Sequence, residues 1–481
     1  MEKQTGVLET TVVGPELRSA LIEIVGPQGC LFDPSDTAPY REDWRQLYEP
    51  CQAVVVRPAS TQEVAAVVRL CAERRIPVVP QGGNTSLVAG ATPVKDGEII
   101  LSLGRMNKIR ELDAVDLTLT TDAGVTLKAA QEAAAAADCM LPLSMGSEGS
   151  AMIGGMLSTN AGGNNTVRFG NARDLVLGLE VVLPDGQIWN GLRRLHKDNT
   201  GYCLRQLFVG AEGTLGIITA AVLKLAPAPR DIAVAFGSVP SVQSALDLFV
   251  FCRRRQADAI QAFEYLGAKV VNMVLKHFPD IHLPLSHPAE HYVMIELASP
   301  APNSGMREKL EEMLGQAADK GLLLDAALAG TAAERRAMWH LREEMTDAQK
   351  REGVSIKNDV SVPVSKVPEF IVQAQEACER RFPGIRVVAF GHMGDGNTHF
   401  NLLVPVGGDP VAFMKQDHAV MDTVNEIVRK FDGSFSAEHG VGRIKPYMVE
   451  SWRGGAELDT MRRIKAALDP LGIMNPGKML P

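Results

Sequence analysis

Two stretches in the C-terminal half of the chain gather residue types that bind metal ions and move protons. "FGHMGDGNTHFNLLVP" places His392 and His399 on either side of a glycine-rich turn, and "SAEHGVG" adds Glu438 and His439. Two imidazoles and one carboxylate suit a divalent ion, most simply zinc with an open coordination position. The residues alone leave a simpler interpretation open, because histidines are commonly surface residues or satisfied core residues.

A β-hairpin is the element that would bring the two histidines together. "RVVAF" at 386–390 enters the glycine-rich turn and "HFNLLVP" leaves it, so we expect two neighbouring strands. His392 and His399 would then lie at one end of the hairpin, close enough to share a ligand. Strand alternation puts His399 and Asn401 on the same face. Asp395 precedes a glycine, a position where an aspartate commonly shapes the turn.

The second stretch needs a sharp bend if both of its reactive residues are to serve one site. Glu438 and His439 are adjacent, and adjacent side chains on a regular strand point to opposite faces. Gly440 and Gly442 follow directly, and glycine permits the backbone conformations that such a bend requires. We therefore expect a turn at "SAEHGVG".

Length and composition bound the rest of the molecule. A chain of 481 residues is too long for one core, so two or three domains are expected. Hydrophobic content of 46% and charged content of 22% are typical of a globular protein. The net charge of −8, with no long basic tract, argues against a nucleic-acid partner.

The cysteines and the first residues of the chain predict where in the cell the protein is located. Seven scattered cysteines without a CxxC pair suit reduced thiols. The first residues lack the pattern of a signal peptide, and no apolar run is long enough to span a bilayer. We therefore expect a cytoplasmic protein without a transmembrane segment, with peripheral attachment to the inner membrane as the alternative.

The order of strand-like and helix-like segments changes near residue 230. Before it, the amphipathic segment 60–75 lies between two short apolar segments, which predicts a βαβ unit, and 175–190 predicts a hairpin. After it, helices such as 367–385 alternate with strands such as 291–299. We expect four parts: an N-terminal helix-and-loop segment at 1–50, a first domain at 51–228, an α+β second domain at 229–430 and a C-terminal helical segment at 431–481 that packs back on the first domain.

Three loops of the first domain are rich in small residues. They are "PQGGNTSLVAGATP", "MGSEGSAMIGGMLSTNAGG" and "VGAEGTLGIITA". Glycine lets backbone N–H groups approach an anion closely, so such loops can hold a pyrophosphate, although any one of them could be an ordinary turn. No GxGxxG motif follows a strand and opens a helix, so the loops predict a dinucleotide site that is not of the Rossmann type.

Long segments of the chain resemble one flavoprotein family. The first half contains "VVRPASTQEVAAVVRLCAERRIPVVPQGGNTSLVAGATP", "GSEGSAMIGGMLSTNAGGNNTVRFGNARDLVLGLEVVLPDG" and "FVGAEGTLGIITAAVLKL", which resemble the FAD-binding domain of the vanillyl-alcohol oxidase/PCMH flavoproteins. The second half contains "FGHMGDGNTHFNLLV", "SAEHGVG" and "LDPLGIMNPGK", which resemble the FAD-linked oxidase branch of that family. The resemblance covers nearly the whole chain from about residue 50. It implies an α+β fold: a PCMH-type FAD-binding domain, a ferredoxin-like α+β substrate domain and a C-terminal helical segment.

The resemblance also implies which residues hold the cofactor. The cofactor-binding set it implies is Pro80, Gln81, Gly82, Gly83, Asn84, Thr85, Ser86, Gly146, Ser147, Gly154, Gly155, Thr159, Gly162, Gly163, Glu212, Gly213, Ile217 and Asn475. Some members tether the flavin through a histidine in these loops. The loops of this chain contain no histidine or cysteine, so we expect FAD to be bound non-covalently.

The same resemblance makes His392, His399 and Glu438 the expected ligands of a divalent metal, most simply zinc. A 2-hydroxy acid presents a hydroxyl and an adjacent carboxylate to such an ion, which fixes the pair and lowers the pKa of the hydroxyl. His439 is the expected catalytic base, because imidazole titrates in the working range. The Cα hydride would leave for flavin N5.

A third group of residues is expected to hold the rest of the substrate. The stretch from residue 338 predicts a helix that stops near Gly353, and Arg342 and Thr346 would share one of its faces. Lys357 follows on a strand. In the D-2-hydroxyglutarate dehydrogenases of the resembling branch, matching residues hold a substrate carboxylate, so Arg342, Thr346, Lys357, Asn401 and His439 are the expected substrate-binding set.

These residues favour an FAD-dependent, metal-assisted dehydrogenase of D-2-hydroxyglutarate or a close D-2-hydroxy acid. A D-lactate dehydrogenase or the FAD subunit of a glycolate oxidase is the alternative within the branch. A flavin-free metal-dependent hydrolase or lyase, and a flavoprotein subunit that only relays electrons, also stay open. An electron-transfer flavoprotein or a quinone is the expected electron acceptor, and a homodimer is one candidate assembly.

Overall fold

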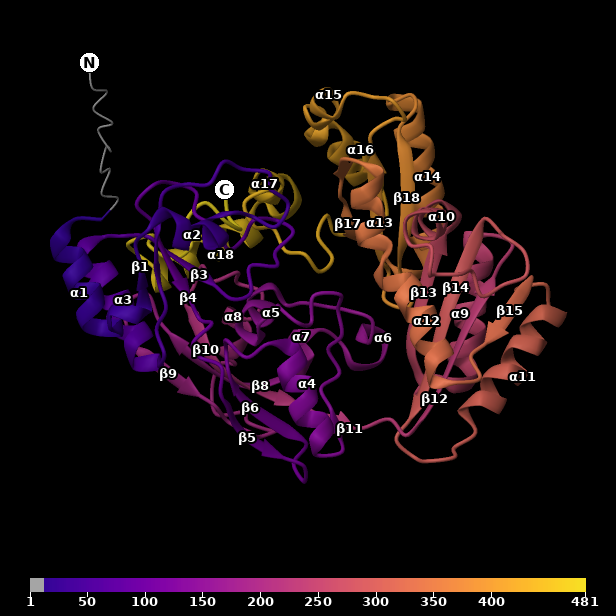
Figure 1. Ribbon diagram of the computed structural model, residues 1–481, viewed down its shortest axis with the longest axis horizontal. Coiled ribbons are helices and arrows are strands. Elements are labelled where there is room, and N and C mark those ends of the chain that lie inside the picture. Colours follow the sequence, from indigo (N-terminus) through magenta and orange to yellow (C-terminus); the bar gives the residue numbers. More distant parts are fainter. Residues whose placement is uncertain (1–12) are drawn as a thin grey trace, which may run out of the picture.

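The first lobe of the molecule is built on two main sheets, as the computed structural model, which describes residues 13–481, shows in Figure 1. The first sheet has the order β1 (Cys30–Leu31), β2 (Val54–Val56), β4 (Ile99–Ser102), β3 (Val78–Gln81). Strands β2 and β3 both run parallel to β4, and helix α3 (Thr61–Arg74) connects them, so the predicted βαβ unit is confirmed with β4 inserted between its strands. The Ser60 hydroxyl caps α3 by accepting the N–H of Glu63 at 3.2 Å.

The second sheet of this lobe is antiparallel. Its order is β5 (Ile109–Asp113), β6 (Thr118–Asp122), β10 (Ile217–Lys224), β8 (Val176–Val182), β9 (Ile188–Gly191). The pairing of β8 with β9 confirms the predicted hairpin. The short elements around it are α4 (Leu127–Ala136), α5 (Ile153–Thr159), α6 (Thr166–Phe169), α7 (Ala172–Leu175), α8 (Arg205–Phe208) and the ribbon of β7 (Cys139–Met140) with β11 (Ala226–Pro227).

The second lobe is built on one eight-stranded sheet. Its order is β15 (Asp325–Leu328), β12 (Asp231–Ser238), β14 (His291–Ser299), β13 (Ile260–Gly267), β18 (Arg386–His392), β19 (Asn397–Leu403), β16 (Ser355–Ile356), and β17 (Asp359–Ser361) also pairs with β19. All of its pairings are antiparallel. The antiparallel pairing of β18 with β19 confirms the hairpin predicted around His392 and His399.

Helices cover both faces of this sheet, which explains why its long strands β12, β13, β14 and β19 are buried along most of their length. On β12, Ala233 and Ala235 face one core while Val234 and Phe236 face the other. The first core contains side chains of α9 (Val242–Gln256), α11 (Met306–Asp319), α14 (Val367–Arg381) and α16 (Asp417–Lys430). The second contains side chains of α10 (Ala268–His277), α12 (Ala332–Glu343) and α13 (Met345–Glu352).

The prediction of a single helix from residue 338 to near Gly353 is wrong, because the structure has two helices there. Helix α12 ends at Glu343 and α13 begins at Met345, and Glu344 between them, with a ψ of −4°, caps both helices. Arg342 and Thr346 therefore lie on different helices and do not share a helix face.

The C-terminal segment contacts both lobes. Ile473 and Met474 are buried in the core of the first lobe, where the Val78 N–H donates to the Ile473 carbonyl at 2.8 Å. Met448 and Val449 of α17 (Pro446–Arg453) belong to a core of the second lobe. Helix α18 (Ala456–Leu468) follows α17. The "SAEHGVG" turn precedes α17, so it is held between the lobes.

The N-terminal segment adds α1 (Pro15–Val25) and α2 (Pro34–Arg41) to the first lobe. The remaining short elements of the chain are η1 (Pro27–Gly29), η2 (Val364–Lys366) and α15 (Pro410–Met414). Residues 1–12 of the predicted N-terminal segment 1–50 lie outside the described residues. The expected lack of a signal peptide rests on these same residues, so the structure does not test it. Among residues 13–481, no helix combines the length and the apolar composition that crossing a bilayer requires.

Candidate active site

A cavity of about 1180 Å³ is lined by residues of both lobes. Pockets for single small ligands commonly enclose about 300–1,000 Å³. This volume therefore suits a long cofactor together with a small substrate. Its lining includes the three glycine-rich loops, the two histidine-containing stretches and the residues expected to hold the substrate.

The glycine-rich loops form one side of the cavity. Of the predicted cofactor residues, those that line it are Pro80, Gln81, Gly82, Gly83, Asn84, Thr85, Ser86, Gly146, Ser147, Gly154, Gly155, Thr159, Gly162, Gly163, Glu212, Gly213 and Ile217. Asn475 is not part of the lining. Its side chain donates to the carbonyls of Glu212 and Gly90, at 2.7 and 3.0 Å, and so supports the third loop from behind.

Glycine is required at several of these positions by close packing of the loops on each other. A Cβ on Gly83 would lie 1.8 Å from the Ser150 carbonyl oxygen, and one on Gly163, whose φ is +145°, would lie 2.1 Å from that of Ser144. A Cβ on Gly146 would meet nothing within 4 Å, so this backbone is open to a ligand. Interlocked loops with an exposed backbone fit the pyrophosphate of a dinucleotide such as FAD.

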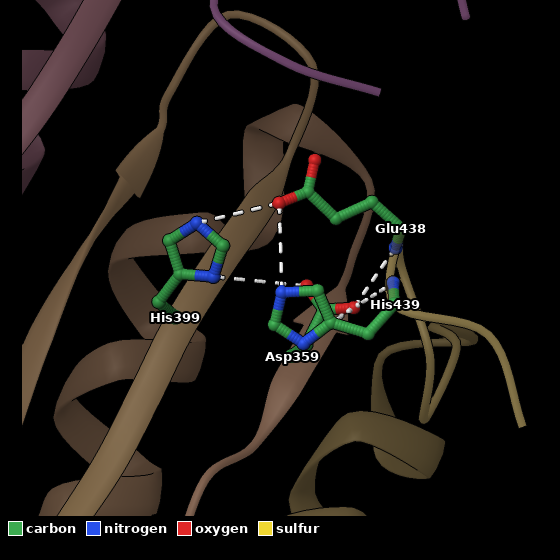
Figure 2. Close-up of side chains that lie close together, drawn as sticks. All are labelled: Asp359, His399, Glu438 and His439. Atoms are coloured by element: carbon green, nitrogen blue, oxygen red, sulfur yellow. Dashed lines mark hydrogen bonds and ion pairs between the residues drawn. The ribbon is translucent and has the colours of Figure 1, made fainter. Parts of the chain in front are cut away.

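Four side chains that can bind a metal ion converge beside the cavity, and three of them, His399, Glu438 and His439, line it. Asp359, His399, Glu438 and His439 have possible ligand atoms that all lie within 4.8 Å of one another (Figure 2). Glu438 Oε1 lies 3.6 Å from His399 Nε2 and 3.7 Å from His439 Nε2. Carboxylate oxygens and imidazole nitrogens at this spacing fit a divalent cation.

Asp359 bends the turn that carries two of these residues. Its Oδ2 accepts the backbone N–H groups of Ala437, Glu438 and His439, at 3.2, 2.8 and 2.8 Å. Three bonds to one oxygen curl the backbone, and Figure 2 shows Glu438 and His439 directed to the same site although they are adjacent. Gly440 has a φ of +82°, which confirms the bend that the sequence requires.

A Cβ on Gly162, in the second glycine-rich loop, would lie 3.0 Å from Glu438 Oε2. The cofactor side and the metal-binding side of the cavity are therefore in contact at this carboxylate.

His392 lies beside this cluster and has a carboxylate partner of its own. Its ring centroid is 5.6 Å from that of His399, and its Nδ1 is 2.7 Å from Glu264 Oε1. Histidines that bind metals commonly donate their other ring N–H to a carboxylate in this way. The contact with Glu264 leaves His392 Nε2 as the nitrogen that can bind a metal.

The buried cluster has unusual proton affinities. Burial raises the pKa of Glu438 to about 7. It lowers the pKa of His439 to about 4, below the working range that the sequence led us to expect for this imidazole. Burial also holds the pKa of His399 well below its usual value. Burial opposes the charged form of His392 too, but the Glu264 carboxylate outweighs it and raises the pKa of His392 to about 9. Neutral His399 and His439 have free lone pairs, and a cation would restore the charged form of Glu438.

The predicted substrate-binding residues Arg342, Thr346, Lys357, Asn401 and His439 all line the same cavity. Arg342 Nε donates to Glu264 Oε2 at 2.7 Å, which fixes the guanidinium with its other edge available. Burial lowers the pKa of Lys357 to about 8. The Asn401 amide nitrogen donates to Gln349 Oε1 at 2.9 Å.

Sequence reasoning missed Asp359 and Glu264. Both are buried carboxylates on strands of the large sheet, at positions fixed by the pairings of Asp359 with His399 and of Glu264 with His392. For Glu264, a charged residue within a mostly apolar strand was the one signal in the sequence, since an unpaired charge is costly to bury. Asp359 begins a three-residue strand and carried no such signal. Their partners depend on strand register, which the sequence did not indicate.

Comparisons with known proteins follow the division into two lobes. Residues 52–191 match the family described as FAD binding domain, and residues 228–479 match the family described as FAD linked oxidases, C-terminal domain. The mitochondrial D-2-hydroxyglutarate dehydrogenase of Bos taurus is 39% identical over 466 residues, which cover 96% of this chain and 83% of the relative. The D-2-hydroxyglutarate dehydrogenase of Xanthomonas citri pv. viticola is 36% identical over 452 residues, 93% of each chain.

Solved structures share the fold at lower identity. p-Cresol methylhydroxylase with substrate bound superposes with a TM-score of 0.76 at 18% identity, covering 96% of both chains. An alkyldihydroxyacetonephosphate synthase superposes with a TM-score of 0.75 at 16% identity, covering 96% of this chain and 85% of that one. At these identities the likeness concerns the fold alone.

Proposed function

Because this chain belongs to the FAD-linked oxidase family of flavoproteins, we propose that it is an FAD-dependent dehydrogenase that oxidises D-2-hydroxyglutarate, or a close D-2-hydroxy acid, to the 2-oxo acid. D-Lactate and glycolate are the alternative substrates. Non-covalent FAD is part of the proposal, since the cavity side formed by the glycine-rich loops offers neither histidine nor cysteine.

The observation that carries the proposal is the shared cavity. Its lining combines the glycine-rich loops, a cationic region with Arg342 and Lys357, and the side chains of His392, His399, Glu438 and His439. A 2-hydroxydicarboxylate matches that division, because its hydroxyl and adjacent carboxylate can chelate an ion while the second carboxylate meets the cations. Guanidinium groups bind carboxylates well through paired N–H donors.

His392, His399 and Glu438 are the proposed ligands of a divalent metal, most simply zinc. Asp359 is less suitable as a ligand because its Oδ2 is already bonded to three backbone N–H groups. When bound, the ion supplies a Lewis acid that orients the 2-hydroxy acid and lowers the pKa of its hydroxyl. Glu264 keeps His392 in place, and Asp359 keeps the Glu438 turn in place.

His439 is the proposed base. Its Nδ1 faces Asp359 Oδ2 at 3.7 Å, so its Nε2 is the nitrogen directed to the centre of the cluster. The neutral imidazole accepts the hydroxyl proton there while the Cα hydride departs. Bound FAD supplies the acceptor for that hydride at N5. The substrate thus loses one hydride and one proton and becomes the 2-oxo acid.

Three further features belong to the proposal. An electron-transfer flavoprotein or a quinone would reoxidise the cofactor, and a homodimer is the candidate assembly. A cytoplasmic location stays a prediction, because the bovine relative carries a mitochondrial name.

A substrate panel tests the proposal. The purified protein is assayed with D- and L-2-hydroxyglutarate, D-lactate and glycolate, with an artificial electron acceptor present. We expect D-2-hydroxyglutarate to give the highest kcat/KM and the L-enantiomer to give none. Highest activity with D-lactate or glycolate would favour those substrates, and a colourless protein that binds no FAD would end the proposal.

A further inference from the structure

The loop at residues 42–48 is folded tightly on itself. The Asp43 side chain is buried and accepts three backbone N–H groups: Oδ2 accepts from Arg45 at 3.0 Å, and Oδ1 accepts from Leu47 and Tyr48 at 2.9 and 3.2 Å. Such a closed set of bonds limits the conformations of a loop. The loop therefore presents its other side chains in fixed directions.

This loop is attached to all three parts of the molecule that surround the cavity. The Asn84 side chain, in the first glycine-rich loop, donates to the Glu42 carbonyl at 2.9 Å. Arg45 Nη2 donates to the Ser355 carbonyl on β16 of the second lobe at 3.3 Å. The Arg443 guanidinium, directly after the "SAEHGVG" turn, lies 3.8 Å from the Tyr48 ring centroid. The loop thus bridges the cofactor side and the substrate side.

Trp44 is the side chain of this loop that lines the cavity. Its ring centroid is 5.2 Å from Lys350 Nζ and 5.9 Å from Lys357 Nζ, within the range of cation–π attraction. Lys357 is one of the residues proposed above to bind the substrate, and Arg45 places a second positive charge near it. Trp44 is 41% exposed, so part of its surface remains free to face a ligand.

An ordinary surface contact between an aromatic ring and a lysine would have little consequence. Here the indole comes from the first lobe, both lysines come from the second, and Trp44 and Lys357 face the same cavity beside Arg342 and Thr346. Removing the ring would widen this part of the cavity, admit water and free the Lys357 ammonium to move. Each change weakens the binding of a distal carboxylate more than the binding of the hydroxyl end of the substrate.

We propose that Trp44 is a specificity-determining residue, which closes the cavity around Lys357 and thereby favours 2-hydroxy acids with a second carboxylate over monocarboxylic ones. This inference rests on the proposed function and adds a residue from the N-terminal segment to the substrate site.

The test compares two substrates in matched variants. In Trp44→Ala, we expect kcat/KM for D-2-hydroxyglutarate to fall on the order of tenfold, mainly through KM, as expected for losing a partly desolvated cation–π contact. The value for D-lactate should stay within about twofold, because a monocarboxylate does not reach Lys357. Trp44→Phe should recover most of the loss, and Tyr202→Ala, which removes a 97% exposed aromatic, is the control with no effect.

Equal losses for both acids in Trp44→Ala, or no change for either, would overturn the inference. If Trp44→Ala fails to fold or to retain flavin absorbance, Trp44→Phe and Trp44→Leu decide: a preference that does not shift between them contradicts the role. The wild-type assay separates this inference from the proposed function. A wild type that oxidises neither acid contradicts the function itself, whereas a normal wild type with unselective variants contradicts only the role of Trp44.

Discussion

Two buried carboxylates, Glu264 and Asp359, hold the histidines and Glu438 of this site in position. Glu264 joins His392 to Arg342, and Asp359 joins the start of β17 to the turn that carries His439. The histidines and Glu438 could be proposed from their types and spacing. The two carboxylates could not, because each acts through a strand pairing between residues far apart in the chain.

The first prediction concerns Asp359. Asp359→Asn preserves the size of the side chain but removes the charge beside His399 and His439. It also replaces one of two accepting oxygens with an NH₂ donor, although Oδ2 accepts from the turn and Oδ1 from Asn397 Nδ2. We expect kcat to fall about 10- to 100-fold, as is usual for residues that orient metal ligands. Bound metal should fall as well, while the fold is retained. Steady-state kinetics and metal analysis measure both, with Asp319→Asn, an exposed residue of α11, as control. Unchanged kcat and metal content would contradict the role of Asp359.

A second prediction concerns pH and Lys357. Burial lowers the pKa of Lys357 to about 8, so its ammonium is charged below pH 8 and loses its proton above it. Because the charged form binds a carboxylate, kcat/KM for D-2-hydroxyglutarate should decline above pH 8, approaching about tenfold per pH unit. The profile for D-lactate should lack this decline, and so should that of Lys357→Met with D-2-hydroxyglutarate. The same decline of kcat/KM above pH 8 for both acids would exclude Lys357 as its cause.

At the scale of elements, the "SAEHGVG" turn is held from both lobes. The Glu212 carboxylate, from the third glycine-rich loop, accepts the N–H groups of Val441 and Gly442, each at 2.7 Å. Asp359 holds the preceding residues of the turn from the second lobe. Loop and turn thus form one unit whose geometry depends on both lobes. The resemblance placed Glu212 near the cofactor, and its bonds to this turn were not foreseen.

Glu212→Ala tests that unit. The substitution leaves the buried N–H of Gly442 and the part-buried N–H of Val441 without an acceptor, and an unsatisfied buried group costs about 1–3 kcal/mol. We expect a clear fall in Tm and a loss of kcat, since the turn also carries Glu438 and His439. Thermal unfolding and steady-state kinetics should change together, whereas Glu73→Ala on the exposed face of α3 should change neither. A variant with unaltered Tm and kcat would show that the turn holds its shape without Glu212.

Element prediction succeeded where the local pattern decides the structure and failed where packing decides it. The helix capped by Ser60 and the hairpin of β18 with β19 form as the sequence predicts. No glycine or proline stands at Glu344, between α12 and α13, so the sequence contains no helix-breaking residue that would predict the break. Both helices nevertheless bring Arg342 and Thr346 to the cavity.

At the scale of the whole molecule, the two lobes are joined by more than the link near residue 230. The tail places Met474 in the first core, and Lys465 Nζ on α18 donates to the Thr214 carbonyl at 2.7 Å. The loop at 42–48 reaches from the first lobe to β16. The family resemblance indicated two domains and a returning tail, but composition and periodicity alone did not indicate that they close around one cavity.

The central claim is that flavin and a metal-chelated 2-hydroxy acid react within that cavity. Anaerobic titration of the purified yellow protein with D-2-hydroxyglutarate tests it most directly. We predict that substrate bleaches the flavin absorbance, that removing the metal with a chelator leaves the protein yellow but prevents bleaching, and that added zinc restores it. His439→Ala should slow the bleaching by about 10²- to 10⁴-fold. Bleaching that is unaffected by both chelation and His439→Ala, or absent with every D-2-hydroxy acid, would contradict the claim.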